Sequence, residues 1–267
     1  MELYKPLHER KLDTQYRTRL RYILKRGFRA GDTAQGTAAI TCFGDLPQMV
    51  FNVENGAPLI TERKVGFKGP IGEIQAFMNG VQTLKGLEEF GCRHFWDGEV
   101  TPEKCKEMRI PEGDLGDGSY GAVFRRFPMP DGRMFDQVSH VLDQARKYPY
   151  TRTLNIVAKI PYYIGRGGFQ KAITTPCHGD QHLRVDNGRL ILHMHQRSAD
   201  MPIGVASNVI QYFALLLMYA QVLGLKPWRY VHSFSDAHIY ENQVEAVRTM
   251  LLRDPKKLPV LRMDPGV

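Results

Sequence analysis

Residues 195–208, with the sequence HQRSADMPIGVASN, decide the fold because they join a predicted strand to a predicted helix. Before them, residues 181–185 and 189–195 flank Asp186-Asn187-Gly188, whose Asn-Gly pair is a strong hairpin signal. After them, residues 208–223 predict a long apolar helix. Gln211 and Gln221 interrupt the apolar run, so we expect this helix to lie in the protein core and not to span a membrane.

A cysteine precedes this segment, in Thr175-Pro176-Cys177-His178. Cysteine attacks as a thiolate, and a neighbouring guanidinium favours that form. Arg197 is a permanent cation, with Ser198 and Asp200 as polar neighbours in the sequence. The alternative is a free cysteine that packs as a small apolar side chain. Together with the rest of the chain, the pattern predicts a nucleophilic Cys177.

Composition places the chain among ordinary globular proteins. Of its 267 residues 43% are hydrophobic and 24% are charged. The net charge of +8 suits an anionic ligand, but a nucleic-acid surface gives the same balance. Cys42, Cys92, Cys105 and Cys177 form no CxxC pair and match no zinc spacing, so we expect no metal site. The first residues do not read as a signal peptide, and we expect a reducing, cytoplasmic setting.

Periodicity and turn signals predict helices and strands along the whole chain. Helices are expected over 13–26, 73–78, 135–147, 208–223 and 240–252, and strands over 37–43, 48–53, 153–159, 181–185, 189–195 and 228–234. Residues 113–121 and 165–168 are expected to be loops. His193 and His195 alternate on one strand face without a third ligand at useful spacing, so we expect a structural role for them. The elements indicate one mixed α/β (α+β) domain over residues 1–267.

Several sequence blocks occur in one order, and together they are more specific than any block alone. They are Gly72-Glu73-Ile74, Phe95-Trp96-Asp97, the Tyr120-Gly121 loop, Pro149-Tyr150-Thr151-Arg152, Thr175-Pro176-Cys177-His178-Gly179, residues 195–208, and Asp236-Ala237-His238-Ile239-Tyr240. From Tyr22 to Leu258 this series resembles the thymidylate synthase family, including the pyrimidine nucleotide hydroxymethylases. The resemblance implies a mixed sheet with flanking helices and a homodimer. It also implies one-carbon transfer from 5,10-methylenetetrahydrofolate to a pyrimidine nucleoside monophosphate.

The resemblance implies four catalytic residues. Cys177 is expected to attack C6 of the pyrimidine ring, which makes C5 nucleophilic toward the one-carbon unit. Glu73 is expected to move protons through water as a general acid and base, although a glutamate entering a helix is more often solvated or capping. Tyr120 is expected to assist removal of the C5 proton, with a core tyrosine as the alternative. Asp200 is expected to face the pterin.

The same resemblance assigns the binding residues. Arg197, Ser198 and Arg152 are expected at the 5′-phosphate, since guanidinium groups bind phosphate in a bidentate manner. Arg152 is expected to come from the partner across the dimer interface. The other assignments are His238 and Tyr240 at the sugar 3′-hydroxyl, Gln196 and Arg29 at the nucleotide, and Trp96, Asp200 and Gly204 at the folate.

Asn208 indicates which base is bound. A carboxamide offers a donor and an acceptor, which match O4 and N3–H of uracil. Cytosine presents an amino donor and an N3 acceptor, and the cytidylate hydroxymethylases that the chain resembles typically have Asp at this position. Asn208 therefore predicts a uridylate, most simply dUMP. The alternative is an asparagine that caps the N-terminus of the helix.

Four features depart from the family pattern. Residues 34–37 lack the arginine of the phosphate loop, for which Arg29 is the nearest candidate, and the tandem interface arginine is reduced to Arg152-Thr153. Asp117-Gly118-Ser119 stands where Pro-Val usually precedes the tyrosine, and the chain stops at Val267, before the apolar tail of methylating members. A closed site keeps water from a reactive exocyclic methylene. The missing tail therefore favours hydroxymethylation of dUMP over methylation.

The leading prediction is a dUMP hydroxymethylase. Within the family, the alternatives are a methylating thymidylate synthase and a CMP or dCMP hydroxymethylase. Outside it, the charge leaves a nucleic-acid-binding module, and a third class is a catalytically inactive binding protein. We expect no nucleic-acid partner because the strands lack interleaved aromatic and basic residues. The joint presence of Cys177, Glu73, Tyr120, Asn208 and Arg197 argues against an inactive member.

Overall fold

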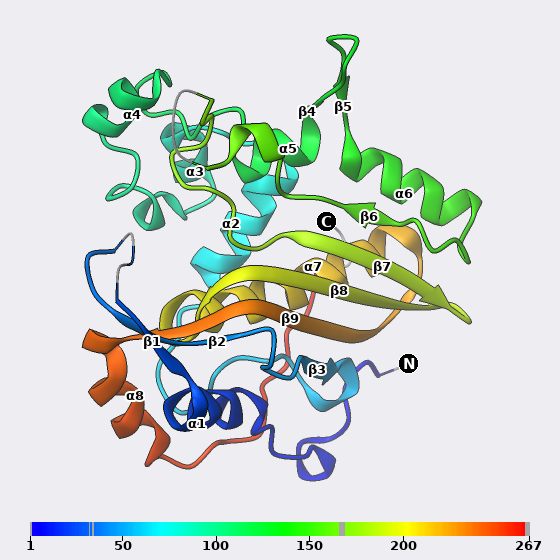
Figure 1. Ribbon diagram of the computed structural model, residues 1–267. Helices are drawn as coiled ribbons and strands as arrows, with labels where there is room; N and C mark the ends of the chain where they lie inside the picture. Colours follow the sequence, from blue (N-terminus) through cyan, green and yellow to red (C-terminus); the bar gives the residue numbers. More distant parts are fainter. Residues whose placement is uncertain (1, 32, 34, 166–168, 265–267) are drawn as a thin grey trace. The chain divides into compact units, whose positions relative to one another are not determined.

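The computed structural model describes residues 2–31, 33, 35–165 and 169–264 and consists of two compact units. Unit 1 comprises residues 1–67 and 186–267, and unit 2 comprises residues 68–185. Figure 1 labels the helices and strands of the two units. The predicted single domain over 1–267 stays a prediction.

A mixed sheet forms the centre of unit 1. Four strands follow the order β1-β2-β9-β8, and a further strand, β3, also pairs with β9. Their bounds are β1 (Phe28–Ala30), β2 (Ala39–Phe43), β3 (Met49–Asn52), β8 (Arg189–Asp200) and β9 (Lys226–Tyr240). The pairs made by β1, β2 and β3 are antiparallel, whereas β8 and β9 run parallel. With helices packed beside the sheet, the predicted mixed α/β class is confirmed.

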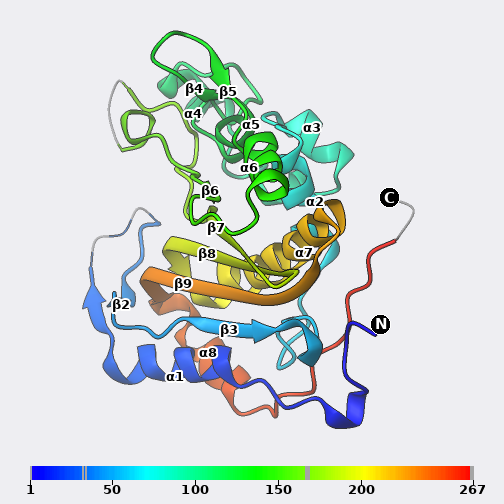
Figure 2. The ribbon, with the colours of Figure 1, turned by 90° about the vertical axis from the view of Figure 1, so that its right-hand side faces the viewer.

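The segment between β8 and β9 forms a buried helix. A π-helical turn, Met201–Val205, leads directly into α7 (Ala206–Leu223), which packs against β8 and β9 (Figure 2). The turn and helix are apolar enough to cross a membrane, but 78% of the most apolar window is buried inside the protein, as in a core helix. Tyr16 of α1 (Gln15–Arg26) anchors the turn, because its phenol donates to the Met201 carbonyl at 2.7 Å.

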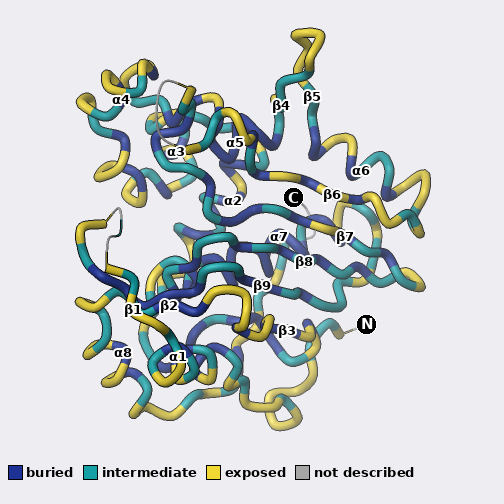
Figure 3. Tube along the Cα trace, viewed as in Figure 1, coloured by how far each residue is buried: buried dark blue, intermediate teal, exposed yellow. Residues whose placement is uncertain are grey.

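The two faces of β8 differ in burial, as Figure 3 shows along the strand. Leu190 and Leu192 lie on the buried face, whereas His193 and His195 lie on the half-buried face. Ser233 Oγ of β9 lies 2.7 Å from His193 Nε2 and 3.2 Å from His195 Nδ1. The imidazole rings therefore hold the two strands together, which fits the expected structural role. Unit 1 is completed by α8 (Val244–Leu251) and by short 3-10 turns.

Unit 2 is mainly helical. Its elements are α2 (Lys68–Met78), α3 (Leu84–Glu89), α4 (Pro102–Met108), α5 (Tyr120–Arg125), α6 (Gln137–Lys147), and the strand pairs β4–β5 (Phe127–Pro128 and Met134–Phe135) and β6–β7 (Asn155–Ile156 and Asp180–Asp186), with the last residue of β7 in unit 1. Helix α5 packs against both α2 and α6. A Cβ at Gly72 of α2 would lie 2.1 Å from the Phe90 carbonyl oxygen, so only glycine allows this close approach, directly before Glu73.

Most predicted elements are present, but several bounds were wrong. The predicted strand 228–234 is part of the longer β9, because β8 pairs with it from Lys226 and β2 pairs with residues 236–240. The predicted strand 153–159 is reduced to β6, since Gln137 and Asp180 side chains accept the N–H groups of Val157 and Ala158. The predicted helix 73–78 begins at Lys68, and the predicted loop 113–121 gives way to α5 at Tyr120.

The turn between β7 and β8 has the predicted conformation. Asn187 and Gly188 have φ angles of 47° and 74°, as the Asn-Gly pair of a type I′ turn requires. Residues 166–168 of the predicted glycine-rich loop, and Ala34 of the predicted phosphate loop, lie outside the described residues.

Candidate active site

Cys177 lies in the loop before β7 and is half-buried. Its backbone N–H donates to Tyr120 Oη at 2.7 Å, and its Sγ lies 3.5 Å from the Thr175 carbonyl oxygen. Tyr120 is the first residue of α5 and is 3% exposed. The structure thus brings the predicted nucleophile and the predicted tyrosine into direct contact.

The other three cysteines are poorer nucleophiles. Burial, with the charge of Asp45, raises the pKa of Cys42 to about 11. Burial, with the charge of Glu73, raises the pKa of Cys92 to about 12. Cys105 is buried as well. Since the thiolate is the attacking form, Cys177 is the cysteine best placed to react.

Tyr120 belongs to an aromatic cluster of unit 2. Its ring stacks on Phe77 at 4.7 Å and on His178 at 4.5 Å between centroids, and it meets the edge of Trp96 at 6.3 Å. Burial, and next the charge of Cys177, raises the pKa of Tyr120 well above its ordinary value. The phenol therefore stays protonated, so that Tyr120 can donate or accept a hydrogen bond but does not act as a phenolate base.

Sequence reasoning gave His178 no role, yet the structure places it beside Cys177 and against Tyr120. It is buried, and this burial, together with the charge of Lys159, lowers the pKa of His178 to about 3. The imidazole is therefore neutral near pH 7 and offers one donor and one acceptor nitrogen. The adjacency of the two residues in Pro176-Cys177-His178 was the available sequence signal.

Glu73 and Trp96 form a hydrogen-bonded pair in the same unit. The indole Nε1–H of Trp96 donates to Glu73 Oε1 at 2.7 Å, and its ring meets Phe77 edge-on at 6.0 Å. Trp96 was predicted to face folate, and here it orients the predicted acid/base carboxylate. We call Glu73, Trp96, Tyr120, Cys177 and His178 the Cys177 cluster.

Asp200 and His238, both predicted site residues, lie side by side in unit 1 because the parallel register of β8 and β9 pairs them. The Asp200 carboxylate accepts the Ile203 N–H at 3.2 Å and Gln243 Nε2 at 3.2 and 3.3 Å. Burial raises the pKa of Asp200, and these hydrogen bonds offset the rise only in part. His238 is buried and meets Tyr240 edge-on at 4.9 Å.

Three further predicted residues are consecutive on β8. Gln196 is 2% exposed and has both ends of its amide engaged: Oε1 lies 2.9 Å from His232 Nε2, and Nε2 donates to the Ser198 carbonyl at 3.0 Å. Arg197 and Ser198 are half-buried. Burial opposes a lowered pKa of Asp236, but hydrogen bonds with His238 and Thr41 and, to a smaller extent, the charge of Arg197 lower it. Gln196 therefore holds the strand backbone that carries Arg197 and Ser198.

The two predicted phosphate arginines outside β8 are exposed. Arg29 pairs with both carboxylate oxygens of Glu241 within unit 1. Arg152 lies in unit 2, where its backbone carbonyl is 3.1 Å from His182 Nε2. Its predicted donation to a partner's phosphate site stays a prediction. Arg197 and Cys177 belong to different units, and their predicted pairing also stays a prediction.

Asn208 does not cap the helix. The cap residue of α7 is Val205, and Asn208 lies inside the first turn, 5% exposed. Its side-chain Nδ2 donates to Gln211 Oε1 at 2.9 Å. A Cβ built on Gly204 would lie 3.7 Å from Asn208 Oδ1, so the carbonyl end of the amide faces the backbone at Gly204. The capping alternative to a role in binding is therefore excluded.

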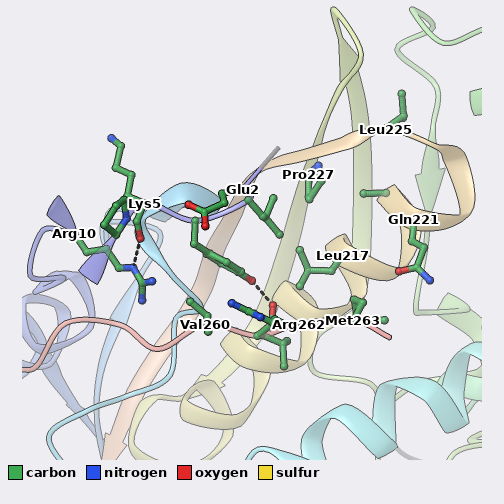
Figure 4. Close-up of a pocket in the computed structure, with 15 residues that line it drawn as sticks. Glu2, Lys5, Arg10, Leu217, Gln221, Leu225, Pro227, Val260, Arg262 and Met263 are labelled. Atoms are coloured by element: carbon green, nitrogen blue, oxygen red, sulfur yellow. Dashed lines mark hydrogen bonds between the residues drawn. The ribbon is translucent and has the colours of Figure 1, made fainter. Parts of the chain in front are cut away.

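A pocket of about 660 Å³ opens elsewhere in unit 1, between residues 2–10, α7 and residues 260–263 (Figure 4). None of the predicted site residues lines it. Arg10 Nε donates to the Lys5 carbonyl at 2.9 Å, and the Tyr4 phenol donates to the Leu261 carbonyl. The Tyr4 bond ties the first residues to the last described segment. Within the described residues, no group of three His, Cys, Asp or Glu side chains gathers closely enough to hold a metal ion.

The sequence model of the thymidylate synthase family matches residues 14–266. This range includes every residue of the Cys177 cluster and all the predicted binding residues. Members of the family carry out folate-dependent one-carbon transfer to a pyrimidine nucleotide and act as dimers.

Proposed function

Because the chain belongs to the thymidylate synthase family, we propose that it transfers a one-carbon unit to C5 of a uridine monophosphate, most simply dUMP. The observation that carries this proposal is the Cys177 cluster. It combines a half-buried cysteine, a neutral phenol bonded to the cysteine backbone, a neutral imidazole and an oriented carboxylate. Covalent catalysis at a pyrimidine ring needs such a nucleophile with proton donors and acceptors beside it.

In the proposed reaction the Cys177 thiolate forms a bond to C6 of uracil. The electron pair of the C5–C6 double bond moves toward C5 and O4, so that C5 becomes the nucleophile. 5,10-Methylenetetrahydrofolate supplies the one-carbon unit when bound. After C5 has formed its new bond, loss of the C5 proton would expel tetrahydrofolate and leave a methylene group at C5. Water would then add to this methylene as the Cys177–C6 bond breaks and the thiolate returns.

The rest of the cluster is proposed to move the protons. The phenol of Tyr120 stays neutral, so it supports a water that removes the C5 proton rather than acting as the base itself. His178 is neutral and can pass or hold a hydrogen bond at the ring. Glu73, oriented by Trp96, is the proposed acid and base at the ring carbonyl and on the folate side.

The proposed nucleotide contacts are the residues that the family resemblance assigns. Arg197, Ser198 and the partner's Arg152 bind the phosphate, and His238 with Tyr240 bind the 3′-hydroxyl. Gln196 acts by holding the backbone of β8, since its amide bonds the Ser198 carbonyl and His232. The Asn208 amide reads O4 and N3–H of uracil. Arg29 is paired with Glu241, so it reaches the phosphate only if this exposed ion pair opens.

Asp200 fits the folate. An ionised carboxylate has about four acceptor positions, and among the described residues the donors at Asp200 are one backbone N–H and the Gln243 amide. Capacity therefore remains for the N–H groups of a pterin. Gly204 lies beside Asp200, because a Cβ built on it would lie 3.9 Å from Asp200 Cβ, and it is proposed to lie at the folate as well. Trp96 is buried, so we propose that it acts on the folate side through Glu73.

We propose 5-hydroxymethyl-dUMP as the product, which requires water to add to an exocyclic methylene at C5. The supporting observation is Ser119, which directly precedes Tyr120 in place of the valine usual in the family. It is 2% exposed, and among the described residues its hydroxyl has no hydrogen-bond partner. Ordered water commonly satisfies such a group. Water held next to the tyrosine favours hydroxymethylation over methylation.

The experiment is product identification by mass after incubation with dUMP and 5,10-methylenetetrahydrofolate. 5-Hydroxymethyl-dUMP with tetrahydrofolate supports the proposal, and dTMP with stoichiometric dihydrofolate identifies the alternative, a methylating thymidylate synthase. Turnover of CMP or dCMP in place of dUMP would identify a cytidylate hydroxymethylase. No covalent complex with 5-fluoro-dUMP would point to a binding protein, and salt-dependent retention of nucleic acid on filters would point to the remaining class.

The Ser119 argument has its own test. Ser119→Val restores the family residue and removes the hydroxyl, so we expect the proportion of dTMP among the products to rise. Ser119→Ala is the matched control for the hydroxyl alone, and it costs no helix cap because the Ser119 side chain makes no capping bond. An unchanged product ratio in both variants would refute the role of Ser119.

We also propose a reducing, cytoplasmic setting and no nucleic-acid or membrane partner. The four cysteines are free thiols, which supports the first part of this proposal.

A further inference from the structure

The side chain that is proposed to recognise the base, Asn208, is hydrogen-bonded to Gln211. Asn208 and Gln211 lie one turn apart on α7, and their side chains meet through the bond from Asn208 Nδ2 to Gln211 Oε1 at 2.9 Å. Gln211 is 0% exposed and Asn208 is 5% exposed. We infer that Gln211 is a positioning residue that sets the preference of Asn208 for uracil over cytosine; this inference rests on the proposed function.

The hydrogen-bond inventory of the amide leads to this inference. A carboxamide has two N–H donors and one carbonyl acceptor. Gln211 Oε1 accepts one N–H of Asn208, and Asn208 Oδ1 lies near Gly204. Asn208 is thereby left with one donor and one acceptor in a fixed order. That order matches O4 and N3–H of uracil, where an acceptor stands next to a donor.

Cytosine needs the reverse order, because its N3 accepts and its 4-amino group donates. Turning the Asn208 amide to match would bring Oδ1 against Gln211 Oε1, so that two acceptors would face each other in a buried place. Gln211 would then have to turn as well. Because Gln211 is fully enclosed, both ends of its turned amide would need new partners inside the protein. The bond thus biases the chain against cytidylates without touching the base.

Two substitutions separate this role from simple packing. Gln211→Glu keeps an acceptor oxygen at the same place, since a carboxyl group has such an oxygen whether burial leaves it ionised or protonated, so it should keep the Asn208 amide in its present order. Gln211→Met has similar length but offers neither a donor nor a strong acceptor, so the Asn208 amide becomes able to turn. The Kd values of dUMP and dCMP, measured by calorimetry, give the base preference even without turnover.

We expect Gln211→Met to reduce the dUMP-over-dCMP preference about tenfold or more, the size of a lost buried hydrogen bond. Gln211→Glu should keep the preference within about threefold. A Gln211→Met preference equal to that of the unmodified chain would overturn the inference, and so would an equal loss in both variants. Circular dichroism of each variant confirms that it is folded.

The outcome is separable from that of the proposed function. If the unmodified chain binds dUMP better than dCMP but turns over neither, the proposed reaction fails, while the Kd ratios still test Gln211. If it turns over dUMP and Gln211→Met keeps the full preference, only the inference about Gln211 fails. If the unmodified chain binds neither nucleotide, both fail.

Discussion

Replacing Tyr120 by phenylalanine removes a single oxygen from the Cys177 cluster. That oxygen accepts the Cys177 backbone N–H at 2.7 Å, and Phe77 and His178 hold the ring in place by stacking. Tyr120→Phe should therefore keep the packing of the aromatic side chain. It leaves the Cys177 N–H without its acceptor, and it removes the phenol that is proposed to assist proton loss from C5 of uracil. The substitution tests stability and chemistry separately.

The expected magnitudes differ for the two effects. An N–H that loses its acceptor in a largely buried place costs about 1–3 kcal/mol of unfolding free energy. For a chain of this size each kcal/mol lowers Tm by roughly 2–4 °C. Loss of a group that assists proton transfer lowers the rate by about 10²–10⁴-fold. We therefore expect kcat on dUMP to fall at least a hundredfold (about 2.7 kcal/mol of barrier).

The assay follows tritium release from [5-³H]dUMP, beside formation of the covalent complex with 5-fluoro-dUMP. Fluorine replaces the C5 hydrogen, so complex formation needs Cys177 but no proton removal. We expect Tyr120→Phe to lose tritium release and to keep the complex. Tyr4→Phe is the matched control, because it also removes one phenol bond to the backbone, at a pocket without predicted site residues. A kcat for Tyr120→Phe within about threefold of the unmodified chain would refute the reasoning, since proton-transfer groups contribute far more than that.

Three further predictions concern His178, Trp96 and Arg152. The pKa of His178 is lowered from 6.5 to about 3 in the folded chain. Between these two pH values the unfolded chain binds a proton that the folded chain does not bind. The contribution of this residue to stability is therefore complete above about pH 6.5 and is lost as the pH falls toward 3. His178→Gln should therefore lose less Tm than the unmodified chain between pH 6.5 and pH 4 in scanning fluorimetry, and equal slopes would contradict the burial argument. Trp96→Phe removes the indole N–H that donates to Glu73 at 2.7 Å. We expect kcat to fall about tenfold with little change in the KM for dUMP. A change in KM alone would assign Trp96 to substrate binding. Arg152→Ala and Cys177→Ser chains, each weak or inactive alone, should regain activity when mixed and refolded together, and no recovery would contradict an arginine donated by the partner.

The elements that the sequence predicted well are those with strong local signals. The apolar run of α7 and the Asn187-Gly188 turn depend on periodicity and on a positive φ, both of which are readable from neighbouring residues. The length of β9 depends on its pairing with β2 and β8, and the loss of the predicted strand 153–159 depends on the side chains of Gln137 and Asp180. Such long-range partners leave no local signal.

The candidate site follows the same division. The motif residues Cys177, Tyr120 and Glu73 were identified from the order of the sequence blocks, and the structure places them in one cluster. The bonds from Trp96 to Glu73 and from Asn208 to Gln211 depend on side-chain orientation, which residue order does not encode. Long-range contacts decide the orientation of these side chains, and therefore the two hydrogen bonds were found only in the structure.

The central claim is a bond between the Cys177 sulfur and C6 of a uridine ring. It is tested most directly by peptide mass mapping of the complex trapped with 5-fluoro-dUMP and 5,10-methylenetetrahydrofolate. We predict that the added mass lies on the peptide that contains Cys177 and is absent from Cys177→Ser. Added mass on Cys42, Cys92 or Cys105, or no covalent complex at all, would contradict the account.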